Sequence, residues 1–299
     1  MDKGPQAGFE LRPIYHLGLI GYPLGHSRSP GLHHAALRAC GLAGEYTLFP
    51  IPPLPAGASA IAALLARVRA GELHGLNVTI PHKPSVMAHI DQLTEVARAV
   101  GAVNTLYMQA GRLVGDNTDV PGFLRDVQRL TGAQRGRALV LGAGGSARAV
   151  VYALARAGWQ VQVLARRSAQ AAELIAVIGA APELNRAQLA AAPLDALLEA
   201  ESAARLTEDC RLVVNTTPLG MDPHPQGNPW PESVPFPPDA AVYDLIYNPN
   251  ETRLVRAARL AGRPADTGAG MLVAQAALAF ARWTGLQPPF EIMEQAFTL

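Results

Sequence analysis

The sequence predicts an α/β protein with two domains, because short apolar strands alternate with helices in two separate stretches of the chain. In the first stretch we predict a strand at 16–21, a helix at 31–40, a strand at 45–49, a helix at 58–70 and a strand at 75–78. In the second we predict a strand at 138–141, a helix at 146–157 and strands at 161–164, 212–214 and 241–245. Such alternation favours parallel sheets, since a crossover helix joins strands that run in the same direction.

Local composition supports the remaining elements. The segment 58–70 is rich in Ala and Leu and contains no Gly or Pro, which favours a helix. Residues 222–238 carry many prolines and are predicted to form an irregular surface segment. The last sixty residues are predicted to be mostly helical, with a long apolar helix from about 270 to 284. Two α/β units, with the chain returning to the first at its end, fit this pattern.

Composition and charge argue against several classes of protein. With 49% hydrophobic and 16% charged residues, the 299-residue chain is globular and long enough for two cores. The 25 Lys and Arg residues nearly balance 24 acidic residues, which argues against a broad surface for nucleic acid or anionic membrane. There is no signal-peptide run and no stretch of about 18 apolar residues, and Cys40 and Cys210 form no CxxC pair. These features predict a cytoplasmic protein with reduced thiols.

A glycine-rich turn between a strand and a helix predicts a dinucleotide site. Residues 138–147 (ALVLGAGGSA) match the pattern G-x-G-x-x-[G/A]. In that pattern the first glycine makes a tight turn, the second leaves room for a pyrophosphate, and the helix N-terminus supplies N–H donors. A tight turn without a ligand is the competing interpretation, and the flanking strand and helix count against it. The predicted cofactor-binding residues of this Rossmann turn are Gly142, Ala143, Gly144, Gly145, Ser146 and Ala147.

The end of the next strand favours NADP over NAD. An NAD-binding domain usually carries Asp or Glu there to bind the ribose 2′-hydroxyl, whereas this chain has Arg166 and Arg167. Guanidinium groups are planar and permanently charged, which suits a 2′-phosphate. Surface arginines are common after strands, so the absent acid is what decides the prediction of NADP.

Polar loops in the first half of the chain are candidates for a substrate site. Ser27 and Ser29 precede the first predicted helix, where their hydroxyls could cap the helix or bind a carboxylate, and capping is the better interpretation of these residues alone. Lys83 and Asp119 end the polar loops NVTIPHK and GDNTD. A Lys–Asp pair could supply and accept the proton that interconverts a ketone and an alcohol, although the residues alone leave this pairing open.

Eight motifs, taken in order, resemble those of the shikimate dehydrogenase family. They are GYPLGHSRSPGLH at 21–33, NVTIPHK at 77–83, GAVNT at 101–105, DNTD at 116–119, GAGGSARA at 142–149, NTTPLGM at 215–221, YNPNET at 247–252 and GAGMLVAQA at 268–276. Any one of them could arise by chance, but the ordered set covers nearly the whole chain and is highly specific.

The resemblance implies an activity and a domain plan. The implied reaction is the reversible, NADPH-dependent reduction of 3-dehydroshikimate to shikimate, on the route to aromatic amino acids. The implied domains are a substrate-binding and catalytic domain at 1–118 plus 267–299, and a Rossmann NADP-binding domain at 119–266. The C-terminal helices are thereby expected to return to the first domain.

The resemblance also implies residue roles. Lys83 is the implied acid/base residue and Asp119 its partner at the ring hydroxyls. The implied substrate contacts are Ser27, Ser29 and Thr79 at the carboxylate with Tyr247 close by, and Asn77, Asn104 and Gln275 at the hydroxyls. The implied cofactor contacts are Thr216, Met221 and Gly268 at the nicotinamide, and the glycine turn, Arg166 and Arg167 along the rest.

Two departures from the family pattern and several alternatives remain. His34 follows His33 where the family often has Asn, and Ala165-Arg166-Arg167 stands where Asn-Arg-Thr is usual, which keeps the charge but loses a hydrogen-bonding side chain. No HExxH or Cys/His cluster organises the histidines, so no metal is predicted.

The alternatives are a quinate/shikimate dehydrogenase with broader substrate or NAD use and a catalytically silent dinucleotide-binding regulator; a non-enzymatic scaffold has the least support. Monomer and homodimer both fit.

Overall fold

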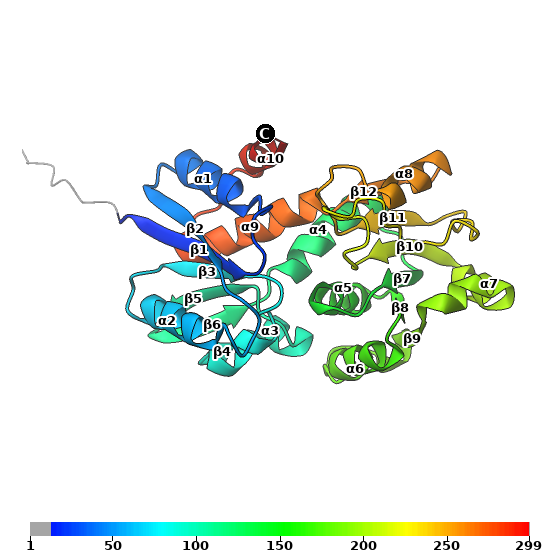
Figure 1. The fold of residues 1–299 in the computed structure, drawn as a ribbon, viewed down its shortest axis with the longest axis horizontal. Coiled ribbons are helices and arrows are strands. Elements are labelled where there is room, and N and C mark those ends of the chain that lie inside the picture. The colour runs from blue at the N-terminus through cyan, green and yellow to red at the C-terminus, as the bar shows by residue number, and fades with distance from the viewer. Residues whose placement is uncertain (1–12, 299) are drawn as a thin grey trace, which may run out of the picture.

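The computed structural model describes residues 13–298, which form two lobes, each built on its own sheet (Figure 1). The first sheet contains β1 (Tyr15–Gly21), β2 (Gly44–Pro50), β3 (Gly75–Val78), β4 (Gln92–Leu93), β5 (Thr105–Gln109) and β6 (Arg112–Asp116), in the order β2-β1-β3-β5-β6-β4. Strands β2, β1 and β3 are parallel, as predicted.

The parallel pattern does not hold at β5, a strand that the sequence did not predict, which runs antiparallel to both β3 and β6. The reason is a two-residue hairpin turn at Ala110 and Gly111, both of which have positive φ angles, of 48° and 75°. Such a turn returns the chain directly along its own strand, so no crossover helix is needed. Asp119 consequently begins a helix immediately after this hairpin, at the carboxyl end of β6.

Helices from both ends of the chain cover the first sheet. They are α1 (Ser29–Ala39), α2 (Ala58–Arg69), α3 (Glu95–Val100), α9 (Ala269–Thr284) and α10 (Phe290–Thr298), with a 3₁₀ helix at Ser85–His89. One face packs on α2 through Ile61, Leu65 and their neighbours. The other face packs on α9, where Trp283 lies in the core and its indole Nε1 donates to the Leu106 carbonyl oxygen at 3.0 Å. The expected return of the C-terminal helices to the first sheet is therefore what the structure has.

The second sheet is parallel throughout. It contains β7 (Arg137–Leu141), β8 (Gln160–Ala165), β9 (Leu189–Pro193), β10 (Cys210–Asn215), β11 (Ala241–Asp244) and β12 (Ala265–Thr267), in the order β12-β11-β10-β7-β8-β9. Its helices are α5 (Gly145–Arg156), α6 (Ser168–Ile178), α7 (Ala200–Thr207) and α8 (Arg253–Leu260), with 3₁₀ helices at Arg186–Gln188 and Leu194–Leu198. Residues 222–238 form neither helix nor strand, as their prolines predicted.

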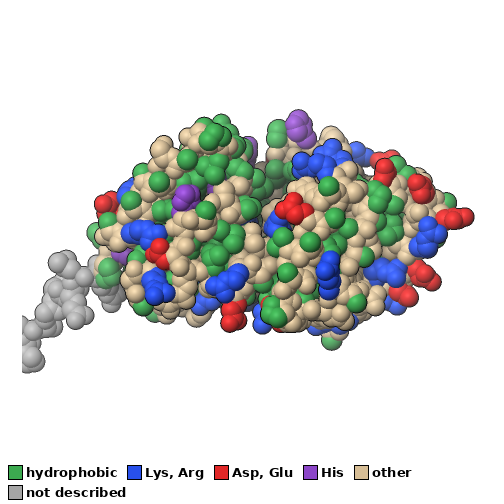
Figure 2. All heavy atoms as spheres, turned by 90° about the horizontal axis from the view of Figure 1, so that it is seen from below, with side chains coloured by type: hydrophobic (Ala, Val, Ile, Leu, Met, Phe, Trp, Pro, Cys, Tyr) green, Lys and Arg blue, Asp and Glu red, His purple; other side chains and the backbone are tan. Residues whose placement is uncertain are grey.

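Two helices lie between the sheets. Helix α4 (Asp119–Thr131) packs along α9 and against α5, and Figure 1 shows α4 and α9 side by side in the middle of the molecule. In the space-filling view the surface is hollowed between the lobes, and basic and acidic side chains are interspersed on that face (Figure 2). The first residue of α4, Asp119, and Gln275 on α9 therefore sit where the two lobes meet.

Candidate active site

A buried ion pair forms the centre of the candidate site. Lys83 lies in the loop that follows β3, and its Nζ donates to Oδ2 of Asp119 at 2.7 Å. The two side chains are only 10% and 8% exposed. Charges removed from water are stable only when they are paired and hydrogen-bonded, so each of these groups depends on the other. The sequence left this pairing open, and the structure brings the two residues together.

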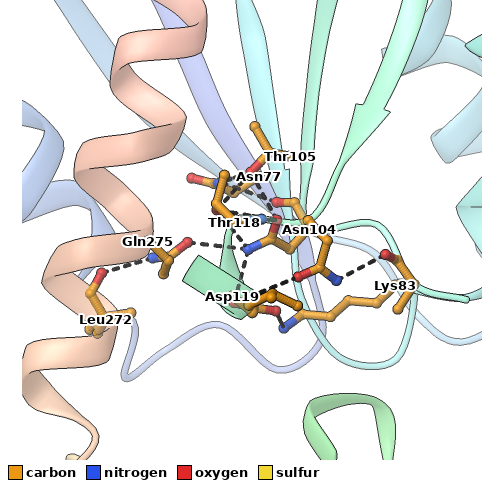
Figure 3. A network of polar contacts seen from close by, with 11 residues as sticks. Asn77, Lys83, Asn104, Thr105, Thr118, Asp119, Leu272 and Gln275 are labelled. Atoms are coloured by element: carbon orange, nitrogen blue, oxygen red, sulfur yellow. Dashed lines mark hydrogen bonds and ion pairs between the residues drawn. The ribbon is translucent and has the colours of Figure 1, made fainter. Parts of the chain in front are cut away.

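Asn104 holds the other carboxylate oxygen of Asp119. Its Nδ2 donates to Asp119 Oδ1 at 2.9 Å and to Thr118 Oγ1 at 3.0 Å, and its Oδ1 accepts from the Thr118 backbone N–H at 2.7 Å. Gln275 of α9 brings its Oε1 within 3.4 Å of the same Nδ2 (Figure 3). Both oxygens of Asp119 thus have a donor, which fixes the orientation of the carboxylate relative to Lys83.

Asn77 extends this network away from the ion pair. Its Nδ2 donates to the Asn104 carbonyl oxygen at 3.1 Å and to Thr105 Oγ1 at 3.3 Å, and its Oδ1 accepts from the Tyr46 hydroxyl at 2.8 Å. Asn77, Asn104 and Gln275 were assigned together as hydroxyl-binding residues, and the structure places them in one connected network. Tyr46 lies within a predicted strand but in none of the motifs, so no sequence pattern indicated its contact with Asn77.

The serine loop and the Thr79 loop lie next to each other. The Tyr22 backbone N–H donates to the Ile80 carbonyl oxygen at 2.9 Å. The Ser27 Oγ accepts from the backbone N–H of Ser29, the first residue of α1, at 3.3 Å. The capping interpretation therefore has support at Ser27, while α1 has no side-chain cap from its N-cap residue. Ser29 is buried at the carboxyl end of the first sheet.

Tyr247 reaches toward the first lobe from the second. It follows β11, and its ring makes an edge contact with Phe297 of α10, with centroids 5.9 Å apart. Burial raises the pKa of Tyr247, and the positive charge of Arg28 partly offsets this effect. The phenol is therefore near the serine loop that contains Arg28.

The glycine-rich turn has the geometry of a phosphate-binding loop. Gly142 has φ +104°, and a Cβ there would lie 2.7 Å from Thr216 Oγ1, so only glycine fits. A Cβ on Gly144 would meet nothing within 4 Å, so the space above the turn is open. Helix α5 then begins at Gly145 without a side-chain cap, which leaves its first N–H groups available. The residues therefore fit a dinucleotide pyrophosphate.

The other predicted cofactor residues follow β8, β10 and β12 of the second sheet. Arg166 and Arg167, at the end of β8, are exposed and form no ion pair in the described part of the chain. The Thr216 hydroxyl donates a hydrogen bond to the Leu141 carbonyl oxygen at 2.7 Å, at the end of β7 where the turn begins. Met221 is 43% exposed. A Cβ on Gly268 would lie 2.3 Å from the Leu245 carbonyl oxygen, so this glycine permits close backbone packing.

Asp244 joins two loops of the second lobe, and it was not identified from the sequence. It is fully buried at the end of β11 and accepts from Asn215 Nδ2 at 2.8 Å, from the Ile246 N–H at 3.1 Å and from Thr252 Oγ1 at 2.8 Å. Burial raises its pKa to about 6, against the opposing effect of these donors. Asp244 ties the loop after β10 to the loop that carries Tyr247. Its only sequence signal was its place at the carboxyl end of a buried strand.

Within residues 13–298, no group of three or more His, Cys, Asp or Glu side chains is placed to hold a metal ion. In the same range, no helix combines the length and the apolar character needed to span a bilayer.

Comparison with known proteins gives similarity across both lobes. Family models match the chain at residues 19–106, for the shikimate dehydrogenase substrate binding domain, and at 268–296, for the shikimate 5'-dehydrogenase C-terminal domain. Over 281 residues the chain is 42% identical to the shikimate dehydrogenase (NADP(+)) of Symbiobacterium thermophilum, covering 94% of this chain and 92% of the relative.

Solved structures agree with these matches. Shikimate 5-dehydrogenase from Thermus thermophilus, in complex with NADP(H) and shikimate, has a TM-score of 0.80 and 38% identity, covering 95% of this chain and 99% of that one. Quinate dehydrogenase from Corynebacterium glutamicum, in complex with NAD, has a TM-score of 0.84 and 35% identity, with coverages of 95% and 99%. The similarity thus extends over both lobes of the chain.

Proposed function

The chain belongs to the shikimate dehydrogenase family. On this premise we propose which of its residues transfer the proton, which bind the substrate and which bind the cofactor. The activity is the NADP-dependent interconversion of 3-dehydroshikimate and shikimate. When bound, the nicotinamide supplies or accepts the hydride, so the protein must add position and a proton.

Lys83 and Asp119 are the proposed proton-transfer pair. The observation that carries this proposal is the 2.7 Å contact between Lys83 Nζ and Asp119 Oδ2 in a buried network. During reduction, the carbonyl oxygen becomes an alkoxide and takes a proton from the pair; during oxidation, the substrate hydroxyl returns that proton to it. Asp119 also keeps Nζ in place and can accept a hydrogen bond from a neighbouring ring hydroxyl.

The choice of lysine at position 83 supports a proton-transfer role. The chain has 25 Lys and Arg residues, and only Lys3 and Lys83 are lysines. An arginine could form the same ion pair with Asp119, but its guanidinium does not release a proton at ordinary pH. A lysine ammonium can. The cation in the site is thus one of the few basic side chains in this sequence that can act as an acid and a base.

The remaining polar residues are proposed to bind substrate at two ends. Ser27, Ser29 and Thr79 would hold the carboxylate, with Tyr247 close by, because the two loops that carry the serines and Thr79 are hydrogen-bonded neighbours. The proposed hydroxyl-binding residues are Asn77, Asn104 and Gln275, which share the network of Asp119. This arrangement supports recognition of a ring that is acidic at one edge and hydroxylated at the other.

The second lobe is proposed to hold NADP along the edge of its sheet. The uncapped start of α5 and the turn from 142 to 147 would bind the pyrophosphate, and Arg166 and Arg167 would bind the 2′-phosphate. Thr216, Met221 and Gly268 would line the nicotinamide. Both arginines lack a competing ion pair in the described residues, which leaves their charge available for a phosphate.

We also propose the domain division predicted from the sequence, with 1–118 plus 267–299 as the substrate domain and 119–266 as the cofactor domain. Cys40 and Cys210 are both free thiols, which fits the predicted cytoplasmic compartment. Monomer and homodimer are the two proposed states, and sedimentation velocity distinguishes them by mass.

Turnover of matched substrate and cofactor pairs tests the assignment. Nicotinamide absorbance is followed with shikimate or quinate, each paired with NADP⁺ or NAD⁺. We expect turnover largely confined to shikimate with NADP⁺. The similarity to a quinate dehydrogenase in complex with NAD makes broader use the second candidate, and equal rates with quinate or NAD⁺ would favour it. No turnover with any pair would instead point to a silent dinucleotide-binding protein.

Variants at position 83 test the proton-transfer pair. We expect Lys83→Ala and Lys83→Arg each to lower kcat by about 10²-fold or more, because neither side chain can exchange a proton at neutral pH. Near-normal turnover in Lys83→Arg would show that charge alone is sufficient and would contradict the proposal.

Chemical labelling gives a readout that does not depend on turnover. Because Lys3 and Lys83 are the only lysines, reductive methylation followed by peptide mass spectrometry reports on Lys83 with Lys3 as the internal reference. Shikimate is expected to slow modification of Lys83 and to leave Lys3 unaffected. Equal rates with and without shikimate would remove Lys83 from the substrate site.

A further inference from the structure

Tyr46 of β2 lies behind the candidate substrate site and has no assigned role. Its side chain is 4% exposed, and its hydroxyl donates to Asn77 Oδ1 at 2.8 Å. The Ser29 hydroxyl lies near enough to lower the pKa of Tyr46, against the larger effect of burial, which raises it. The phenol hydroxyl therefore contacts a proposed hydroxyl-binding asparagine directly.

The imidazole of His33 holds the Tyr46 ring flat. The two rings are stacked, with centroids 4.3 Å apart and planes 5° from parallel. The ring centroid of Trp283 of α9 lies 5.1 Å from that of His33. His33 is completely buried, and neither ring nitrogen meets hydrogen-bond geometry with a described residue. Burial lowers the pKa of His33 to about 3, an effect that the nearby Asn77 offsets only in part. The ring is therefore neutral and acts through its shape.

The contact of Tyr46 is transmitted to the ion pair. Because the Tyr46 hydroxyl donates to Asn77 Oδ1, the Asn77 amide must present Nδ2 to the Asn104 carbonyl oxygen and to Thr105 Oγ1. The Asn104 side chain in turn donates to Asp119. A rotation of the Asn77 amide would place two oxygens against each other and disturb this chain of contacts.

We propose that Tyr46 is a positioning residue for substrate recognition: its hydroxyl orients Asn77, and the stacked His33 ring fixes the plane of the phenol. This inference rests on the proposed function, because it takes Asn77 as a substrate-binding residue. Tyr46 touches neither the reacting atoms nor the cofactor residues, so its loss is expected to affect substrate binding more than the chemical step.

The variant Tyr46→Phe tests this role, because it keeps the ring on His33 and removes one hydroxyl. We expect the KM for shikimate to rise about tenfold, which is the size expected for the loss of one buried hydrogen bond. The kcat and the KM for NADP⁺ are expected to change less than about threefold. Tyr152→Phe is the matched control. It removes a hydroxyl that donates to Glu183 at 2.5 Å in the second lobe, and both KM values are expected to stay within twofold of the parent.

His33→Ala tests the stacking contact separately. It is expected to raise the KM for shikimate as Tyr46→Phe does. The double variant is expected to match Tyr46→Phe within twofold, because both changes act on the hydrogen bond from the Tyr46 hydroxyl to Asn77. Multiplied effects in the double variant would overturn the stacking role. A shikimate KM within twofold of the parent in Tyr46→Phe, or equal rises in both KM values, would overturn the whole inference. If the parent itself fails to turn over shikimate, the proposed function has failed instead.

Discussion

At the scale of single residues, the site depends on polar groups that are buried and almost fully paired. Lys83, Asp119 and Asn104 satisfy one another, so their positions are set before any ligand arrives. Such preorganisation places the cost of ordering these side chains in folding rather than in each catalytic cycle. Asp244 plays the comparable part in the second lobe, where it joins two loops through neutral donors.

Asp244 gives a pH-dependent stability with a defined sign. Its folded pKa of about 6 lies above the ordinary value of 3.8, so between these values the folded chain binds more protons than the unfolded chain. The contribution of this group to stability is therefore full below about pH 3.8 and is lost as the pH rises through 6. The difference corresponds to about 3 kcal/mol.

The variant Asp244→Asn is expected to lose this dependence. Its amide keeps an acceptor for Asn215 and the Ile246 N–H, but it carries no charge at any pH. Urea unfolding at pH 4.5 and 7.5 gives the free energies, and the variant should gain stability relative to the parent at the higher pH. Asp195→Asn, at an exposed position, is the control. An identical change with pH in the parent and in Asp244→Asn would contradict the prediction.

The sequence motifs predicted some of these residues but not others. Lys83 and Asp119 stand at strand ends where ligands bind, so a pattern pointed to them. Tyr46 and His33 work through a stacked contact between β2 and α1, which no local spacing encodes. Their role follows only once the helix is docked on the sheet.

At the scale of elements, the fit between β3 and α9 is tight. A Cβ on Gly75 would lie 2.1 Å from the Trp283 ring, whose Nε1 donates to Leu106. We expect Gly75→Ala to lower the free energy of unfolding by about 1–3 kcal/mol through overpacking. Gly31→Ala is the control, because its Cβ would meet only the Ala296 carbonyl oxygen at 3.8 Å and the change favours helix α1 by up to about 1 kcal/mol. Equal stabilities in urea unfolding would refute this picture of the α9 contact.

Element periodicity predicted β1, β2 and β3 of the first sheet and β7, β8, β10 and β11 of the second, but it missed β9, β12 and the β5–β6 hairpin. The signal was present in residues 105–116, where two apolar-rich runs flank Ala110 and Gly111. An Asn-Gly turn would have been a stronger indication of a hairpin than Ala-Gly. The orientation of β5 is consequential, because it directs the chain through Asp116 into α4 and so places Asp119 beside Lys83.

At the scale of the whole molecule, the two lobes are built differently. The second lobe draws on two core clusters: one lies entirely within 139–265, and only Val100, Ala102 and Met271 among the buried members of the other lie outside 119–266. The first lobe depends on residues from the far end of the chain, since Trp283, Phe280 and Met293 belong to its cores. The proposed domain division follows this distribution of apolar contacts.

Separate fragments test that division. Residues 119–266 are expected to unfold cooperatively on their own, whereas 1–118 are expected to lack a cooperative transition unless 267–299 are joined to them through a linker. Circular dichroism during thermal unfolding of the three fragments provides the measurement. A cooperative transition in 1–118 alone would show that α9 and α10 are not needed for the first core.

The return of α9 and α10 has a consequence for synthesis in the cell. A ribosome releases the strands of the first sheet early, but the helices that cover one of its faces emerge only after the whole second lobe. During that interval Leu17, Leu19 and Tyr107 lack the partners that bury them in the finished protein. The second lobe can therefore complete its fold before the first sheet is covered by α9 and α10. The substrate side of the molecule is thus the last part to fold.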